Sequence, residues 1–138
     1  MKLSAKSEYA FLALIYLAKN YEQGLLKIKE IAKAQKIPKK YLEQILIILK
    51  RAGYVKSRAG LNGGYYLGRP PEKINLAEII RLIDGALAPI ESVSKYFYTP
   101  TPLEQEEGMI RVLRKLRDHI AKVMETTTLA NVINKTKK

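Results

Sequence analysis

The spacing of apolar residues along this chain predicts a mainly helical protein. Residues 6–19 form the first expected helix, and Ser4 is its expected N-cap. The apolar side chains of this segment, from Tyr9 through Leu17, occupy every side of a helix, which requires burial on several sides. We therefore expect one side to pack within its own domain and another to pack against a partner subunit.

Two amphipathic helices follow, joined by a turn at Lys36–Ile37–Pro38. The first spans residues 28–35, and the second begins with Pro38 at its first helical position, where the missing N–H costs no hydrogen bond. Gly53 is the expected stop. Both helices carry residues of one face at i, i+3, i+4 and i+7, and those of the second helix are Leu42, Ile45, Leu46 and Leu49. This order predicts a helix-turn-helix motif.

A hairpin comes directly after this motif. Tyr54–Arg58 and Tyr65–Arg69 have the pattern of two short strands, and Gly60–Gly64 joins them with residues that permit positive φ. Pro70–Pro71 ends the second strand. A two-stranded hairpin in this place is the wing of a winged helix-turn-helix domain.

A linker helix is expected next. Asn75 and Glu78 form a capping-box pair at its start, and Gly85 ends it. The segment that follows, residues 86–100, holds two prolines and the aromatic cluster Tyr96–Phe97–Tyr98, and we interpret it as a loop.

A long helix is predicted from Thr101 to Glu125, because Thr101–Pro102–Leu103–Glu104 combines a cap, a proline and an acidic third residue. Its apolar residues alternate spacings of four and three, which is typical of the seam of a packed helix pair. We assign dimerisation to this seam, formed by Met109, Leu113, Leu116, Ile120 and Val123. Packing within the chain is the alternative. A short last turn at 129–133 precedes a basic tail.

The predicted fold is therefore mainly α and has two parts. Residues 1–73 form a winged helix-turn-helix DNA-binding domain with a two-stranded wing. Residues 74–138 form the linker helix, the loop and the long C-terminal dimerisation helix.

The net charge of the 138-residue chain is +12 and is unevenly placed. Residues 1–73 hold 15 Lys+Arg against 5 Asp+Glu, a net +10, whereas residues 74–138 hold 10 against 8, a net +2. This asymmetry favours double-stranded DNA as the partner over an anionic membrane, and a solvated lysine-rich surface is the alternative. The apolar run at residues 9–18 is too short to span a membrane, which predicts a cytoplasmic protein.

The second helix of a helix-turn-helix enters the major groove with its N-terminal side chains on the base edges. Lysine reaches guanine or phosphate, glutamine suits adenine, glutamate accepts from cytosine N4, and isoleucine contacts the thymine methyl. Arginine further along the helix meets phosphate, and the wing approaches phosphate or the minor groove. The DNA-binding candidates of the helix and the wing are Lys39, Lys40, Glu43, Gln44, Ile47, Arg51, Arg58 and Asn62.

The chain resembles the Rrf2 family of winged-helix regulators, which includes IscR, NsrR and CymR. The resemblance rests on the strings LSAKSEYAFLALIYLA, IAKAQKIPKKYLEQILIILKRAGYV and SRAGLNGGYYLGRP, and it covers nearly the whole chain. It implies a dimeric regulator, in most relatives a repressor, that binds palindromic promoter sites, with the long helix crossing to the partner. It also implies base contacts from Lys40, Glu43 and Gln44 and phosphate contacts near Lys6 and Tyr9.

The chain departs from many members of this family because it contains no cysteine. Disulfides, thiolate zinc sites and cysteine-held iron–sulfur clusters are thereby excluded, and we predict no cofactor and no metal site. The signal remains open between a regulatory partner protein, a small ligand held by Tyr96–Phe97–Tyr98, no effector at all, and a chain from which cysteines were removed.

An enzyme is disfavoured, because the chain lacks a cysteine nucleophile, metal-ligand spacing and a phosphate-binding loop that leads into a helix. The function predicted from the sequence is a sequence-specific, homodimeric DNA-binding transcriptional regulator. The alternative is a winged-helix module that binds other proteins and does not read DNA.

Overall fold

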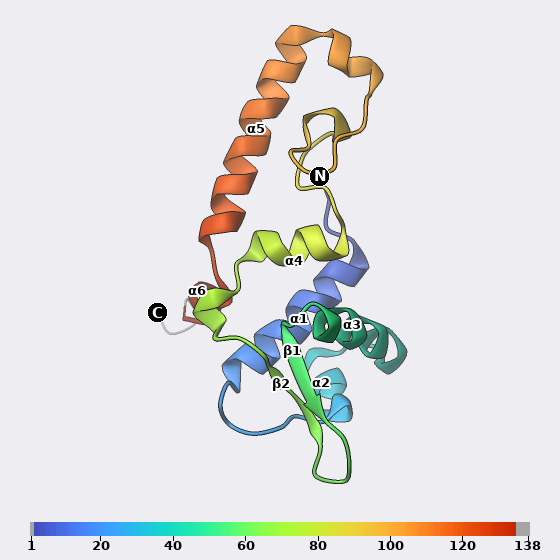
Figure 1. The fold of residues 1–138 in the computed structure, drawn as a ribbon, viewed down its shortest axis with the longest axis vertical. Coiled ribbons are helices and arrows are strands. Elements are labelled where there is room, and N and C mark those ends of the chain that lie inside the picture. The colour runs from blue at the N-terminus through green and yellow to red at the C-terminus, as the bar shows by residue number, and fades with distance from the viewer. Residues whose placement is uncertain (1, 135–138) are drawn as a thin grey trace.

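The computed structural model describes residues 2–134 and contains the predicted elements in the predicted order (Figure 1). Four helices, a hairpin and the short last helix form the body, from which one long helix extends along the longest axis. The elements are α1 (Ala5–Lys19), α2 (Ile28–Gln35), α3 (Lys39–Arg51), β1 (Val55–Arg58), β2 (Gly64–Leu67), α4 (Leu76–Ile83), α5 (Glu107–Thr126) and α6 (Leu129–Asn134), with 3₁₀ turns at Pro71–Lys73, Glu91–Val93 and Pro102–Gln105. The predicted basic tail lies outside the described residues.

Helix α1 is the centre of the body, and its own chain covers it. The Ser4 hydroxyl accepts a hydrogen bond from the Ser7 backbone N–H at 3.0 Å, which confirms the predicted N-cap. Helices α2, α3, α4 and α6 and strand β2 all pack against α1, and none of its apolar residues from position 9 to 18 is exposed. The chain therefore covers much of α1 itself, with α6 folding back onto it, but Phe11, Leu12 and Ile15 are only partly buried, and cover by a partner subunit stays a prediction.

The turn between α2 and α3 differs from the prediction by one residue. Lys36 closes α2 in the left-handed conformation with φ of 54°, and Pro38 is the N-cap of α3, with φ of −57° and ψ of 128°. Its extended ψ keeps Pro38 outside the helix, so Lys39 takes the first helical position. At the other end Gly53 has φ of +87°, as the predicted stop requires.

The wing is an antiparallel pair in which Val55 faces Leu67 and Arg58 faces Gly64. The connection between α1 and α2 adds a third segment, because Leu26 and Tyr65 exchange backbone hydrogen bonds of 2.9 and 2.7 Å. In the tip, a Cβ on Gly63 would lie 2.1 Å from the Arg58 carbonyl oxygen, so only glycine fits there. The wing is thus attached to the body along strand β2.

Helix α4 begins with the predicted capping box, in which Asn75 and Glu78 bond each other's backbone N–H at 3.0 and 2.9 Å. The start of α5 was predicted too early. Thr101 precedes a separate 3₁₀ turn, Glu106 is extended, and the helix begins at Glu107.

Two backbone hydrogen bonds then return the chain to the body after α5. The Leu76 N–H donates to the Thr127 carbonyl at 2.9 Å, and the Leu129 N–H donates to the Ile74 carbonyl at 3.0 Å. Ile74, Ile79 and Leu129 belong to the same core as α1 and α3, so residues on both sides of position 73 share one core. The domain boundary at residue 73 stays a prediction.

Candidate nucleic-acid interface

Helix α3 separates its core residues from its DNA-reading candidates. Its four predicted core residues are fully buried. The candidates on the other side are all exposed: Lys39, Lys40, Glu43, Gln44, Ile47 and Arg51. Ile47 leaves 49% of its surface open to solvent, although it is apolar, so its side chain is available for a contact outside the protein.

Tyr9 of α1 and Tyr41 of α3 stack beside this surface, with ring centroids 6.1 Å apart and an angle of 19° between the planes. The Lys40 ammonium lies 5.4 Å from the centre of the Tyr41 ring, a cation–π contact that orients this lysine at the start of α3. Lys6, Tyr9 and Gln44 line a surface cavity of about 310 Å³ next to the stack. The structure thus brings candidates from α1 and α3 together at one edge of the reading helix.

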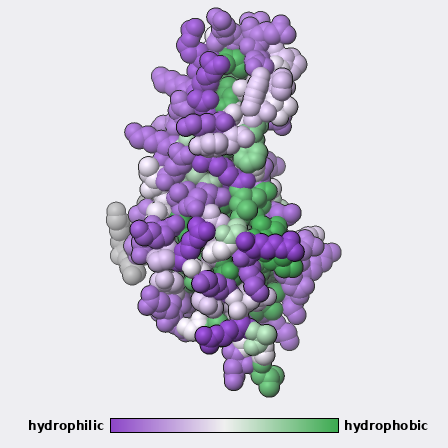
Figure 2. Space-filling view, viewed as in Figure 1, coloured by the Kyte–Doolittle hydropathy of each residue, from purple (hydrophilic) through white to green (hydrophobic). Residues whose placement is uncertain are grey.

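The wing places its candidates at a second location. Arg58 ends β1 and Asn62 lies in the tip, and both are exposed. Leu61 is 94% exposed, and Figure 2 shows an apolar patch at the end of the wing. Lys27, the N-cap residue of α2, donates from Nζ to the carbonyls of Leu61 at 2.5 Å and Gly63 at 3.2 Å. These two bonds hold the tip against the start of α2.

The basic side chains of this surface are not neutralised by neighbouring carboxylates. In the part of the chain that the structure describes, ion pairs join Arg69 to Glu78, Arg81 to Glu125 and Arg117 to Asp118, and all three lie outside α2, α3 and the wing strands. Glu43 is the one acidic residue of α3. The unpaired cations are available to phosphates, whereas a carboxylate among them favours selectivity between sequences.

A polar cluster connects this surface to α4. Tyr54, on the link between α3 and β1, donates to Glu78 at 2.9 Å, and the Arg69 guanidinium lies 4.4 Å from the centre of the Tyr54 ring. Burial and then the bond to the Glu78 carboxylate raise the pKa of Tyr54, which keeps the phenol protonated as a donor. Arg69 also donates to the Ala52 carbonyl at 3.2 Å, at the end of α3.

Comparison with known proteins identifies the family. Residues 3–135 match the family model described as "Rrf2: Iron-dependent Transcriptional regulator". The chain belongs to the Rrf2 family. It is 36% identical over 137 residues to the HTH-type transcriptional regulator CymR of Bacillus subtilis strain 168, with 99% of this chain and 92% of that protein covered.

Solved Rrf2 structures have the same fold. CymR (YrzC), titled the global cysteine regulator of B. subtilis, superposes with a TM-score of 0.79 at 32% identity and covers 97% of both chains. T. potens IscR gives a TM-score of 0.76 at 31% identity over 99% of this chain and 88% of that one. Like these Rrf2 proteins, the chain is a winged-helix DNA-binding transcriptional regulator.

The iron named in the Rrf2 family description does not fit the residues of this chain. It has no cysteine to hold an iron–sulfur cluster. Glu104, in the 3₁₀ turn between α4 and α5, accepts a hydrogen bond from the Tyr98 hydroxyl. Within residues 2–134 no three His, Asp or Glu side chains gather in a way that could hold a metal ion. No helix among these residues is long and apolar enough to cross a membrane.

Three residues of the surface were missed by the sequence analysis. Tyr41 could have been found, because it stands in the first turn of the reading helix beside Lys40. Leu61 also gave a signal, as the one large apolar residue in a glycine-rich tip. Lys27 gave none, because its carbonyl partners lie 34 and 36 residues further along the chain.

Proposed function

We propose that this Rrf2 protein is a homodimeric transcriptional repressor that binds palindromic promoter sites through α3 and the wing. The exposed, unpaired basic face of α3 beside the wing carries the proposal. Such a face supports base contacts from Lys40, Glu43 and Gln44, phosphate contacts from Lys6, Lys39 and Arg51, and minor-groove or phosphate contact from Arg58. A transcriptional regulator must have access to chromosomal DNA, so we infer a cytoplasmic protein.

A homodimer is supported by the surface of α5. The predicted seam divides between two sides of this helix: Leu113 and Ile120 pack partly against the chain's own clusters, whereas Met109, Leu116 and Val123 are 47%, 44% and 47% exposed. Val112, at 61% exposure, and His119 complete the exposed side. Residues 109, 112, 116, 119 and 123 alternate spacings of three and four, the period of a two-helix seam.

A second copy of this chain is the occupant that suits the exposed side. The helix of 20 residues is about 30 Å long, and its apolar stripe runs along most of that length. A shallow groove of about 520 Å³ runs beside Leu116 and His119, and Lys115, Asp118 and Lys122 also line it. Two copies related by a two-fold axis would present two α3 helices, which is why we infer a palindromic site.

Selection from random duplex oligonucleotides with the purified protein tests this proposal. We expect a two-fold-symmetric motif, bound by two chains, with an affinity that falls steeply as the salt concentration rises. Light scattering of the complex gives the number of chains. Recovery of no motif, or a saturated complex with one chain per site, would refute the dimeric DNA reader. Repression is read from a reporter gene behind the selected site.

One observation favours a second candidate function, in which a partner protein controls this chain or is simply bound by it. Tyr96, Phe97 and Tyr98 expose 63%, 46% and 48% of their surfaces in the loop between α4 and α5. A module that only binds proteins would keep its activity when Lys40 and Arg58 are both changed to alanine and would lose it with Leu116→Asp. Loss of activity in the folded, dimeric double variant excludes that module.

A further inference from the structure

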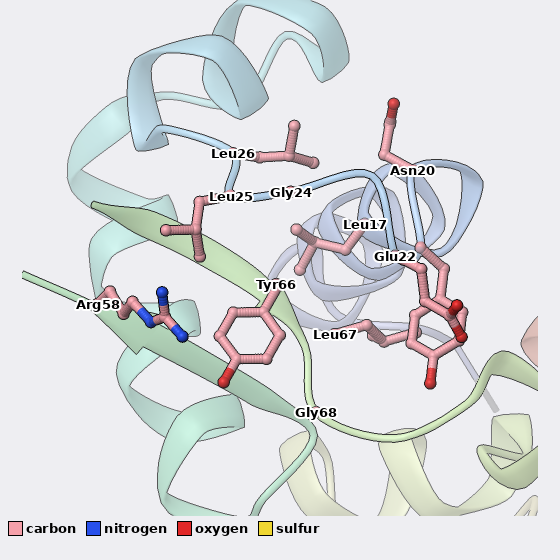
Figure 3. Close-up of a pocket in the computed structure, with 11 residues that line it drawn as sticks. Leu17, Asn20, Glu22, Gly24, Leu25, Leu26, Arg58, Tyr66, Leu67 and Gly68 are labelled. Carbon is pink, nitrogen blue, oxygen red and sulfur yellow. The ribbon is translucent and has the colours of Figure 1, made fainter. Parts of the chain in front are cut away.

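A cavity of about 440 Å³ lies between the α1–α2 connection and the outer face of the wing (Figure 3). Leu17, Leu25 and Leu67 give it apolar walls, and Tyr66 contributes an aromatic ring. Figure 3 shows the Arg58 guanidinium turned from β1 toward the Tyr66 ring, below Leu25. The volume lies within the range of small-molecule sites, which combine apolar walls with a few polar groups.

Arg58 is the cation of this cavity, and its charge is uncompensated. Its guanidinium forms no ion pair and no hydrogen bond with any residue in the described part of the chain. Glu22, the acidic lining residue, stands with Leu67 on the other side of the cavity in Figure 3. A guanidinium beside leucine and tyrosine side chains matches an anion that carries an apolar body.

We propose that this cavity binds a small carboxylate with a flat apolar body, and that the bound carboxylate withdraws Arg58 from DNA. The planar fork of arginine bonds a carboxylate with two parallel hydrogen bonds. The leucine and tyrosine walls disfavour a small, fully hydrated anion such as inorganic phosphate, because it would leave them without an apolar partner. The ligand therefore requires both halves, the carboxylate and the apolar body.

The position of Arg58 couples this cavity to the DNA surface. The same residue lines a second, shallower groove on the neighbouring surface, together with Lys27, Lys29 and Gly60 of the wing tip. That groove is basic and lies at the start of α2, where a DNA phosphate would be held. One guanidinium cannot bond a ligand carboxylate and a phosphate in full at the same time, so ligand and DNA compete for it.

The binding half of this proposal is independent of the proposed function, whereas the competition half rests on it. The first experiment titrates 2-naphthoate into the full chain without DNA and follows heat and the methyl signals of the lining leucines. We expect saturable binding, at least about ten-fold weaker binding to Arg58→Gln, and no comparable binding of the neutral isostere 2-naphthamide. Leu25→Trp should block the cavity.

Lys56→Gln is the matched control, because Lys56 is an exposed cation of the same strand that does not line the cavity. This variant should bind 2-naphthoate as the wild type does. Equal binding to wild type and Arg58→Gln, or equal binding of acid and amide, would overturn the site.

The second experiment measures DNA affinity with and without saturating 2-naphthoate. The dissociation constant of the wild type should rise at least about five-fold, and that of Arg58→Gln should not change further. Unchanged wild-type affinity at saturation would overturn the competition. A ligand-free protein that binds no DNA would instead refute the proposed function, and the titration of the free protein would remain decisive for the site.

Discussion

Tyr54 donates its phenolic hydrogen bond to Glu78 across 2.9 Å, and this bond joins the base of the wing to the first turn of α4. Glu78 also accepts from the Asn75 backbone N–H at 2.9 Å and pairs with Arg69 at 3.6 Å. One carboxylate therefore fixes the direction of α4 relative to the DNA-reading surface. Because α5 follows α4, the same carboxylate contributes to the spacing of two reading helices in the proposed dimer.

Tyr54→Phe should lower the free energy of unfolding by about 1 kcal/mol, since it removes this hydrogen bond and keeps the ring beneath Arg69. Glu78→Ala should cost more, about 1–3 kcal/mol, because the capping box is lost as well. Urea unfolding of both variants and of the double variant gives their coupling energy. A coupling below about 0.3 kcal/mol would show that the bond contributes nothing to stability.

The sequence was sufficient for the parts of this fold that depend on local rules. The Ser4 cap, the Asn75–Glu78 capping box and the stop at Gly53 all follow from short-range chemistry, and the structure confirms them. The predicted start of α5 was wrong, because the cap and proline at Thr101–Pro102 begin a 3₁₀ turn of four residues and not the α-helix. In sequence, such a turn looks the same as the first turn of an α-helix.

Features that depend on distant parts of the chain were not accessible from the pattern. The cover of α1 by α6 joins residues more than 100 positions apart, and periodicity carries no information on which surface meets which. The division of the α5 seam between two sides of the helix could not be predicted for the same reason. Its apolar arc is wide enough for two contacts, and only the folded chain tells which edge Ile110 and Met124 bury and which edge Leu116 leaves open.

Gln44 and Arg51 should differ in how they affect DNA binding. Gln44→Ala removes a base contact and should cost about 1–3 kcal/mol on the selected site, with relaxed preference at one base pair. Arg51→Ala removes a phosphate contact and should weaken all sequences alike, with the slope of log affinity against log salt reduced by about 0.9. Titrations of specific and scrambled duplexes at several salt concentrations separate the two. Equal losses on both duplexes for Gln44→Ala would exclude base reading.

Tyr41 should position Lys40 without contacting a base itself. Tyr41→Ala removes the stack on Tyr9 and the ring beneath Lys40, so specific affinity should fall by about 0.5–1 kcal/mol. Tyr41→Phe is the matched control, because it preserves both the stack and the cation–π contact, and it should bind as the wild type does. Fluorescence anisotropy with the selected duplex measures this. A loss with Tyr41→Phe as large as with Tyr41→Ala would assign the role to the hydroxyl.

Leu116→Asp should convert the proposed dimer into a monomer, because it places a carboxylate in the middle of the exposed stripe of α5. Arg111→Asp introduces the same side chain at an exposed position of α5 away from the stripe and should remain dimeric. Light scattering gives the mass of both variants, and circular dichroism verifies that they are folded. A dimeric Leu116→Asp protein would place the contact elsewhere.

Asp84 should make stability depend on acidity, because it joins the end of α4 to the start of α1. Its partial burial opposes ionisation, but hydrogen bonds from the Ser4 hydroxyl and the Ser4 backbone N–H, together with the charge of Lys6, lower the pKa of Asp84 below 3.8. A lowered pKa in the folded state contributes stability that is fully present above the unfolded value near 3.8 and is lost as the pH falls through the folded value. Solvent screening of this exposed carboxylate keeps the contribution under about 1 kcal/mol.

Urea unfolding of wild type and Asp84→Asn between pH 7 and pH 3 measures this contribution. The wild type should be more stable at pH 7, and the difference should shrink toward zero as Asp84 is protonated at the acid end. Ser4→Ala removes the hydroxyl donor to Asp84, so the unfolding free energy of this variant should depend less on pH than that of the wild type. The missing helix cap should add a loss of about 1 kcal/mol that is the same at every pH. A difference between wild type and Asp84→Asn that stays constant down to pH 3 would mean that the charge of Asp84 does not act through this bond.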